Sequence, residues 1–357
     1  MRAFIAVAMS LLSGCRHAAS PADVRRVAHD EAPHTAPPAE RWLRGQLHVH
    51  SNRSGDSESP PEIVARWYQA HHYDFIVFTD HNAVTRLDWP GPMRVFAGIE
   101  LTQNYRTCSP PPLPGMSCLL HMNALFVSAP APEHVAFADP TDLDRGAILR
   151  RAIERGRALG GILQMNHPDF HYALDAALLT ALAREGVPLV EVANEAIDSN
   201  NQGDATHPST EALWDAVLTA GATMYATATD DAHHYDDAEA VRARGEMVFT
   251  GDRGWVMVQA TLDERSIRDA LTRGDFYASN GVVLSRVERM PTRLEIEVDA
   301  SSPGDHRFEF IGAGGRVLTT TTGRRAAFSL DGIESPYVRA VVTDTSGHRA
   351  WTQPVRR

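Results

Sequence analysis

The sequence contains no lysine, so all 34 of its basic residues are arginine. This absence excludes Schiff-base catalysis and the phosphate-binding lysine of a P-loop. Three cysteines are too few for a disulfide-rich scaffold or a thiolate zinc cluster. Positive charge is also in deficit, because 45 acidic residues give a net charge of −11, which argues against sequence-independent nucleic-acid binding. Histidine, by contrast, occurs 17 times, so any bound metal would be held by imidazole and carboxylate groups.

The N-terminus has the pattern of an export signal. The apolar run at residues 3–12 is too short to span a bilayer but has the length of a signal-peptide core. It ends in Leu12-Ser13-Gly14-Cys15, which resembles the bacterial lipobox. We therefore expect residues 1–14 to be a signal peptide and residues 15–43 to be a lipidated cysteine (Cys15) with a flexible tether. The alternative is a plain secretory signal with a chance cysteine, and this signal would also export the protein. Lipidation would anchor the protein to a membrane surface without a membrane-spanning segment, and the protein would face the periplasm or the outside.

The other two cysteines, Cys108 and Cys118, flank a proline-rich stretch. In an oxidising compartment, two cysteines that close a short loop predict a disulfide bond. Two free thiols are the alternative.

From Gly45 onward, apolar strand-like runs alternate with helical patterns, which favours a parallel sheet that is either open or closed into a barrel. The expected strands are 46–50, 75–81, 95–101, 121–127, 162–167, 189–194, 224–229, 255–260 and 276–278. The expected helices are 61–71, 144–159, 174–184, 210–220 and 264–273. Beyond about residue 284 the strands become short and alternating, separated by Gly, Ser, Pro and Asp. They predict a small antiparallel β-domain over 285–357, of sandwich type.

Polar residues cluster at the ends of these strands. His48 and His50 are two residues apart, so both side chains point to one face, and Asp231 and His233 have the same spacing. In barrels, residues at the carboxyl ends of the strands converge over one mouth. The residues expected to converge are His48, His50, His81, His121, His167, His233, Glu100 and Asp231, with Asp56 close behind His50.

This set is too large for one catalytic zinc, which takes three protein ligands and water. Two or three divalent cations bridged by carboxylates fit the number of ligands better. Four further histidines lie off the pattern and are expected to be structural: His71, His72, His207 and His234. Asp169 and His171 follow His167 closely and could face the substrate or support the ligands.

At this point the chain resembles a known family. Leu47-His48-Val49-His50-Ser51, Thr79-Asp80-His81-Asn82, Gly98-Ile99-Glu100, Asn166-His167-Pro168 and Asp231-Ala232-His233 are similar to the successive motifs of the PHP (polymerase and histidinol phosphatase) superfamily. Residues 255–258 and 274–281, and the final Trp351-Thr352-Gln353-Pro354, resemble its carbaryl-hydrolase-like (CehA/McbA) branch. The resemblance implies a distorted (β/α)7 barrel over residues 44–284, with two or three ions of zinc, manganese or iron.

Carried over position by position, the resemblance implies one metal held by His48, His50, Glu100 and Asp231. Asp56, His81 and His233 would hold another, and Glu100 would bridge to a position shared with His121 and His167. Asp56 departs from the pattern, because trinuclear phosphatases of the superfamily tend to place a histidine there, and this leaves the number of metals open. Asp80, Asn166, Asn194 and Asp230 are expected to support the ligands or face the substrate.

The implied chemistry is hydrolysis by a metal-bridging hydroxide, with Asp231 or His171 moving the proton. A phosphoester is the first expected substrate, and Arg53 or Arg106 would then bind its charge. A carboxyl or carbamate ester on the same site is the alternative, and a metal-binding lipoprotein without turnover is the third. No nucleic-acid partner is expected, and the protein is expected to contact a membrane only through its N-terminal lipid.

Overall fold

The computed structural model describes residues 39–137 and 141–356. The predicted signal peptide, Cys15 and all but the last residues of the predicted tether lie outside the described residues. Within the described part, no helix is long and apolar enough to cross a membrane.

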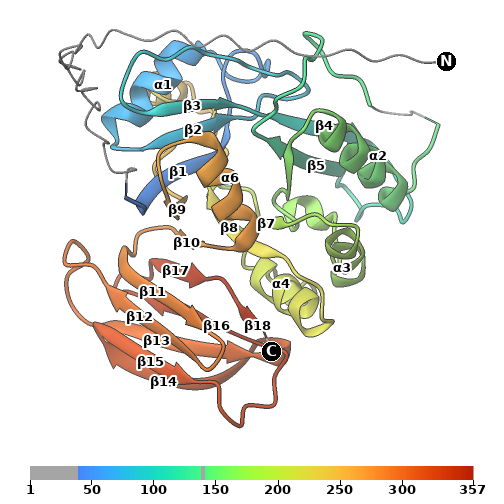
Figure 1. The fold of residues 1–357 in the computed structure, drawn as a ribbon. Coiled ribbons are helices and arrows are strands. Elements are labelled where there is room, and N and C mark those ends of the chain that lie inside the picture. The colour runs from blue at the N-terminus through green and yellow to red at the C-terminus, as the bar shows by residue number, and fades with distance from the viewer. Residues whose placement is uncertain (1–38, 138–140, 357) are drawn as a thin grey trace, which may run out of the picture. The chain divides into compact units, whose positions relative to one another are not determined.

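The first sheet positions the His48–His50 pair. Strand β1 runs parallel to β2, which runs parallel to β3, and β1 pairs on its other side with antiparallel β9, which pairs with antiparallel β10 (Figure 1). These strands are β1 (Arg41–Val49), β2 (Phe75–Phe78), β3 (Arg94–Ala97), β9 (Trp255–Ala260) and β10 (Phe276–Ser279).

The second sheet has five strands, in which β4, β5 and β6 are antiparallel neighbours and β6, β7 and β8 are parallel neighbours. They are β4 (Ile99–Tyr105), β5 (Cys118–Leu125), β6 (Ile162–Met165), β7 (Leu189–Asn194) and β8 (Tyr225–Thr229). Ile148 and Leu149 of α2, Leu182 of α3 and Val217 of α4 are buried in one apolar cluster with residues of these strands.

The helices lie close to their predicted positions, because four of the six begin at a side chain that caps the first turn. Asp144, Asp175, Ser209 and Asp263 each accept a hydrogen bond from the backbone N–H three residues later. The helices are α1 (Pro61–Ala70), α2 (Arg145–Ala158), α3 (Ala176–Arg184), α4 (Thr210–Thr219), α5 (Ala238–Ala243) and α6 (Glu264–Arg273), with a short 3₁₀ turn η1 (Phe170–Tyr172). The sequence patterns missed α5 and η1.

The predicted closed barrel is not seen in the described residues, and the sheets are only partly parallel. The expected strand 95–101 is divided at Gly98, where the chain leaves the first sheet and enters the second. A Cβ at Gly98 would lie 2.6 Å from the Phe78 carbonyl oxygen, so the close approach of backbone there requires glycine. In the described residues, isolated bridges such as Val49–Ala232 and His81–Glu100 help to join the two sheets.

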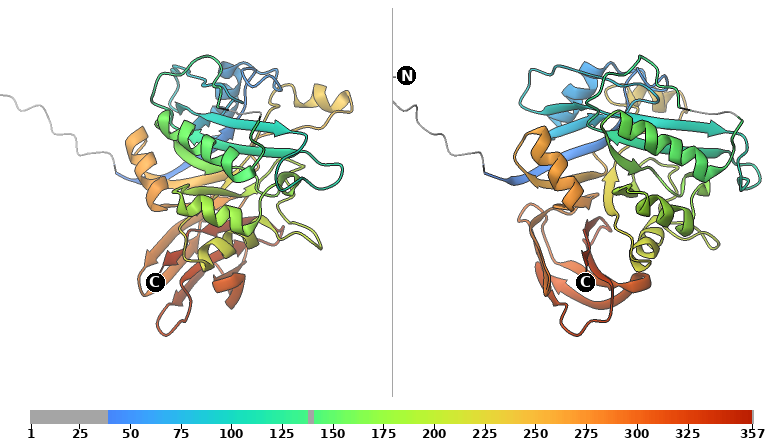
Figure 2. Two further views of the ribbon diagram at one scale, coloured as in Figure 1. Left: turned by 90° about the vertical axis from the view of Figure 1, so that its right-hand side faces the viewer. Right: turned by 45° about the vertical axis from the view of Figure 1, so that its right-hand side comes forward.

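The C-terminal strands form two facing antiparallel sheets around their own apolar core, as Figure 2 shows from two sides. Strands β11, β12 and β15 form one sheet, and β14, β13, β16 and β17 the other, with β18 paired to β16. Their bounds are β11 (Leu284–Met290), β12 (Arg293–Val298), β13 (His306–Gly312), β14 (Arg316–Gly323), β15 (Arg325–Ser329), β16 (Tyr337–Thr343), β17 (Arg349–Thr352) and β18 (Val355–Arg356), with a short turn η2 (Ala313–Gly315). Strand β17 also pairs with β10, so hydrogen bonding is continuous across the predicted domain boundary at residue 284.

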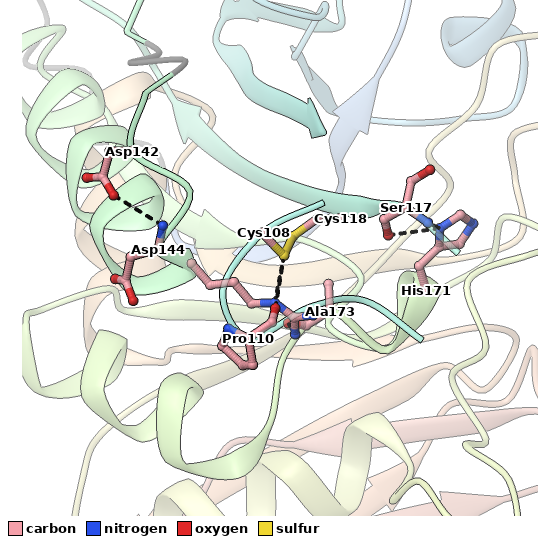
Figure 3. The surroundings of a disulfide bond; sticks show 9 residues. Cys108, Pro110, Ser117, Cys118, Asp142, Asp144, His171 and Ala173 are labelled. Carbon is pink, nitrogen blue, oxygen red and sulfur yellow. Dashed lines mark hydrogen bonds between the residues drawn. A yellow bond between two sulfur atoms is a disulfide. The ribbon is translucent and has the colours of Figure 1, made fainter. Parts of the chain in front are cut away.

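The predicted disulfide bond between Cys108 and Cys118 is present, with an S–S distance of 2.09 Å (Figure 3). It closes the proline-rich loop between β4 and β5, which we call the disulfide loop (residues 108–118). The Arg145 guanidinium donates to the Ala173 carbonyl at 2.6 Å and contacts Cys108 Sγ at 3.0 Å. The loop is thereby held against the start of α2 and the end of η1.

Candidate metal centre

The two sheets bring the predicted ligands together where they meet. His48 and His50 lie at the end of β1 and point to one face, and His50 N–H donates to the Ala232 carbonyl just after β8. That hydrogen bond holds the neighbouring Asp231 beside the two histidines. Asp231 Oδ1 lies 3.2 Å from His48 Nε2 and 3.0 Å from His50 Nε2.

Glu100 of β4 lies at the middle of the cluster and is fully buried. Its oxygens lie 2.7 Å from His81 Nδ1, 3.1 Å from His121 Nδ1 and 3.5 Å from His167 Nε2. They also lie 3.5 Å from the Nε2 atoms of both His48 and His50. Glu100 therefore touches histidines from both sheets, which is the position of a bridging carboxylate.

Asp56 lies on the more open side of the cluster. Its Oδ2 is 3.1 Å from His81 Nε2 and 3.5 Å from His233 Nε2. The His233 ring also stacks on His50, with centroids 4.1 Å apart. Asp56 therefore lies beside His81 and His233, the two histidines with which the family resemblance groups it.

The donor atoms fit divalent cations. His48 Nε2, His50 Nε2 and Glu100 Oε2 are buried and, despite the short distances to neighbouring ligand atoms, have no partner in hydrogen-bonding geometry, although such atoms normally have one. Ligand atoms within 4.8 Å of one another form three overlapping groups: His50, Asp56, His81 and His233; His48, His50 and Glu100; and Glu100, His121 and His167. Imidazole and carboxylate are ligands that zinc, manganese and iron accept. The division of these residues among individual ions stays a prediction.

The outward nitrogens of several histidines are held by neighbours, which fixes ring orientation. His48 Nδ1 contacts Glu191 Oε1 at 2.7 Å, His50 Nδ1 contacts Ser54 Oγ at 2.7 Å, and His121 Nε2 contacts Asn104 Oδ1 at 2.7 Å. The Nε2 atoms of His48 and His50 and Nδ1 of His121 therefore face the cluster.

Sequence reasoning missed Glu191, which lies in the middle of β7 and is fully buried. Besides His48, it accepts hydrogen bonds from the His167 backbone N–H at 2.7 Å, Asn194 Nδ2 at 2.9 Å and Thr229 Oγ1 at 2.7 Å. A carboxylate inside the apolar run Leu189-Val190-Glu191-Val192 was the available signal, because a buried strand excludes an unpaired charge.

The residues expected to support the ligands do lie behind them. Asp80 accepts from Ser51 N–H at 2.6 Å, and Asn166 donates to Glu100 Oε1 at 2.8 Å. Asn194 Nδ2 donates to Asp231 Oδ2 at 3.1 Å. Asp230 is buried and accepts from Gln46, Tyr68 and the backbone N–H groups of residues 252–254. Burial raises the pKa of Asp230 to about 6.

Electrostatics in the cluster keep its buried carboxylates ionised. Burial raises the pKa of Asp231, but the charge of His48 and the polar contact with His50 Nε2 outweigh this and leave the pKa well below its usual range. Burial, together with His233, lowers the pKa of His50 to about 3. Burial opposes ionisation of Glu100 as well, yet the neighbouring histidines hold its pKa well below the ordinary value. The carboxylates are therefore ionised and His50 is neutral. Burial lowers the pKa values of His48, His81, His167 and His233, but the neighbouring carboxylates outweigh this and raise them, so metal binding would displace protons from these four rings.

Two site residues have left-handed backbone conformations that only glycine adopts freely. Asp231 has φ of 51° and His167 has φ of 23°. Such conformations cost free energy and persist where the surroundings impose them, which is common at functional sites.

The structure does not bring His171, Asp169 or Arg53 to the cluster. His171 Nδ1 accepts from Ser117 N–H of the disulfide loop at 3.1 Å, and its ring belongs to that contact rather than to the metal ligands (Figure 3). Asp169 lines a different cavity, and burial together with Asp204 raises its pKa to about 7. Arg53 is exposed and lines an outer cleft that reaches His81.

A pocket of about 280 Å³ opens above the cluster. Leu119, Phe170, Ala196 and Phe249 form its apolar walls, and no arginine of the described residues lines it. Asp198 also lines this pocket, a residue that sequence reasoning did not single out. Burial and the charge of Asp231 raise the pKa of Asp198.

No protein-family model and no curated protein sequence matches the chain. The structure is similar to that of a two-domain protein from Bacteroides vulgatus containing a predicted PHP-like metal-dependent phosphoesterase: 17% identity, 88% of this chain and 97% of that chain covered, TM-score 0.46. A second similarity, to an endonuclease/exonuclease/phosphatase from Beutenbergia cavernae, has 13% identity, coverage of 87% and 100%, and a TM-score of 0.19. Neither similarity is close enough to assign a function.

Proposed function

We propose that this protein is a metal-dependent phosphoesterase of the PHP type. The observation that carries the proposal is the convergence of six histidines and three carboxylates at the floor of one pocket, with buried donor atoms that lack hydrogen-bond partners. The motif resemblance of these same residues supports the PHP assignment, and its carbaryl-hydrolase-like branch remains part of the proposal.

The charge of the donor set favours an anionic substrate. Six of the nine donors are histidines that bind metal as neutral groups, so only Asp56, Glu100 and Asp231 contribute negative charge. Two or three divalent cations would therefore leave the centre net positive. A phosphoester carries its negative charge at the reacting group, so it would be attracted to this centre even though no arginine in the described part of the chain lines the pocket.

The residues of this chain take separate parts in the proposed reaction. Bound divalent cations would acidify water and polarise the scissile phosphoryl group. Asn194 orients Asp231 through the 3.1 Å hydrogen bond, which favours Asp231 as the group that accepts the proton of the attacking water. Asp198, whose raised pKa keeps a larger protonated fraction, is proposed to donate to the leaving group in place of His171.

The test combines metal analysis with a substrate comparison. Purified protein is expected to contain two or three equivalents of zinc, manganese or iron and to hydrolyse p-nitrophenyl phosphate, with activity lost on chelation and restored by metal. Asp231→Asn should lose activity by at least a hundredfold. Glu239→Gln, which removes an exposed carboxylate, is the matched control. Protein without metal after purification and reconstitution would overturn the proposal.

The pocket favours one second candidate, a carboxyl or carbamate esterase. Leu119, Phe170, Ala196 and Phe249 give it apolar walls, and among the described residues no guanidinium lines it to bind a phosphate dianion. Comparing p-nitrophenyl phosphate with p-nitrophenyl acetate and p-nitrophenyl N-methylcarbamate keeps the leaving group constant, so kcat/KM reports the acyl or phosphoryl preference alone. A metal-loaded protein that turns over none of the three would instead favour a metal-binding role without catalysis.

We further propose that the protein is an exported lipoprotein anchored through Cys15. The Cys108–Cys118 disulfide supports export, because such bonds persist in oxidising compartments. Mass spectrometry of the mature N-terminus in a bacterial host is expected to find a diacylated or triacylated cysteine at position 15. A processed but unlipidated N-terminus would leave export standing and refute the anchor.

A further inference from the structure

The segment that follows β6 separates two cavities. His167 and Phe170 line the pocket above the metal centre, whereas Asp169 and Tyr172 line a second cavity of about 320 Å³. The disulfide loop contributes Pro111 to this second cavity, and its volume lies at the lower end of the range for small-molecule sites.

The walls of the second cavity are held in place by contacts of several kinds. The disulfide bond closes the loop that carries Pro111 and Leu113. The Tyr172 ring stacks on His207 with centroids 3.9 Å apart, and His207 Nδ1 lies 2.9 Å from Asp204. The Tyr172–His207 stack joins η1 to residues 204–208, and the Ser117–His171 hydrogen bond joins η1 to the disulfide loop, so three separate segments form a preformed cavity.

Asp169 brings a buried carboxylate oxygen without a hydrogen-bond partner to this cavity. It is 1% exposed, its Oδ2 has no hydrogen-bond partner, and no arginine or histidine of the described residues forms an ion pair with it. Arg145, which also lines the cavity, donates to the Ala173 carbonyl instead. A buried carboxylate normally has a cation or several N–H donors beside it, so a ligand that supplies them would satisfy Asp169.

We propose that this cavity is a second binding site, separate from the metal centre, for a small organic cation such as an amine or amidine on an apolar or planar body. The cationic group pairs with Asp169, while Pro111, Leu113 and the ring of Tyr172 contact the body of the ligand. Asp175, which also lines the cavity, offsets the charge of Arg145 and keeps the cavity suited to a cation.

Benzamidine and benzamide test the proposal as a matched pair, because they share shape and differ in charge. Isothermal titration of the full chain is expected to give one benzamidine site with Kd in the millimolar range or tighter, and no binding of benzamide. Asp169→Asn should weaken benzamidine binding at least tenfold. Asp198→Asn, which removes a carboxylate from the metal pocket, should leave it unchanged.

Leu113→Arg provides a second variant, because residue 113 is 37% exposed and tolerates a charged side chain without disturbing the core. The new guanidinium would occupy the cavity and exclude benzamidine. Circular dichroism establishes that each variant is folded. Wild-type protein that does not bind benzamidine, or folded Asp169→Asn and Leu113→Arg variants that bind it as tightly as wild type, would overturn the proposal.

Discussion

Glu191 stands directly behind the metal centre and holds three of its parts in place: the His48 ring, the His167 backbone and the Asn194 amide. Glu191→Gln keeps the volume but presents an amide N–H to groups that are themselves donors. We expect metal affinity to fall about 10- to 100-fold, the usual effect of removing such a support. Competition with a fluorescent chelator measures the affinity. Unchanged affinity would mean that His48 is oriented without Glu191.

Phe249 is a half-buried wall of the pocket. Its ring packs in a T-shaped arrangement with His233, 5.8 Å between ring centroids, and its backbone carbonyl accepts from the His233 N–H at 3.0 Å. Phe249→Ala should raise KM for p-nitrophenyl phosphate about tenfold with kcat nearly unchanged, because it removes apolar contact that ground state and transition state share. Steady-state kinetics, with metal content measured in parallel, checks this. A fall in kcat at constant KM would instead place Phe249 in the support of His233.

The candidate ligands could be predicted from sequence because histidines two apart at a strand end have few structural explanations. Glu191 could not be predicted with the same ease, since a single glutamate in a strand gives no spacing to compare. The structure does not place His171 with the candidate ligands, for a related reason. Its nearness to His167 in sequence did not determine the direction of its side chain, which the left-handed backbone at His171, with φ of 52°, turns toward the disulfide loop.

At the scale of elements, α4 and β16 are joined by buried charges. Arg339 is 1% exposed and makes two 2.7 Å hydrogen bonds to the carboxylate of Asp215, while its guanidinium lies 4.7 Å from the Trp214 ring. Arg339→Met should lower the free energy of unfolding by about 3–5 kcal/mol, because it leaves Asp215 buried without its cation. Urea unfolding followed by tryptophan fluorescence measures the loss. The double variant Arg339→Met/Asp215→Leu should recover much of it.

Glu211 of α4 also contributes to the contact between α4 and β16, because it pairs with Arg339 and Arg349. Through Glu211, the free energy of unfolding depends on pH in the acid range. Burial raises its pKa, but the two arginines outweigh this and hold the pKa below the ordinary 4.5. Below pH 4.5 the unfolded chain therefore binds more protons than the folded one, and the stability supplied by Glu211 is lost as the pH falls through its folded pKa. Thermal unfolding of Glu211→Gln from pH 7 to 3.5 should show a smaller drop than wild type. Parallel curves would contradict this.

Helices were predicted well because capping residues and apolar spacing are local signals. The path of the chain from one strand to the next could not be predicted in this way, because it depends on residues distant in sequence. Gly98 divides what appears in the sequence as one apolar strand. The reason lies in residues distant in sequence, because the Phe78 carbonyl, the Val77 side chain and the Ala124 carbonyl leave no room for a side chain there. The expectation of a closed, largely parallel barrel was wrong for the same reason, since strand direction is set by partners distant in sequence.

At the scale of the whole molecule, the sequence indicated that short, alternating strands begin near residue 284. It did not indicate how these C-terminal strands connect to the rest of the protein. Strand β17 pairs with β10, and the Gln353 side chain makes two 2.8 Å hydrogen bonds to the Ala226 backbone in β8. Strand β8 leads directly to Asp231. The C-terminal strands therefore stabilise a strand that positions a proposed metal ligand.

A chain ending at Val283 should consequently fail to fold into a metal-binding protein. It loses the partner of β10, the hydrogen bonds to Ala226 and the Arg339–Asp215 contact, so buried polar groups are left unpaired in the remaining sheets. The matched control begins at Ala39, the start of the unit that contains every described element, and ends at residue 357. We expect this control to be soluble and to bind metal, whereas the fragment 39–283 aggregates or binds none. A soluble 39–283 fragment with the same metal content would mean that the centre forms from the two N-terminal sheets alone.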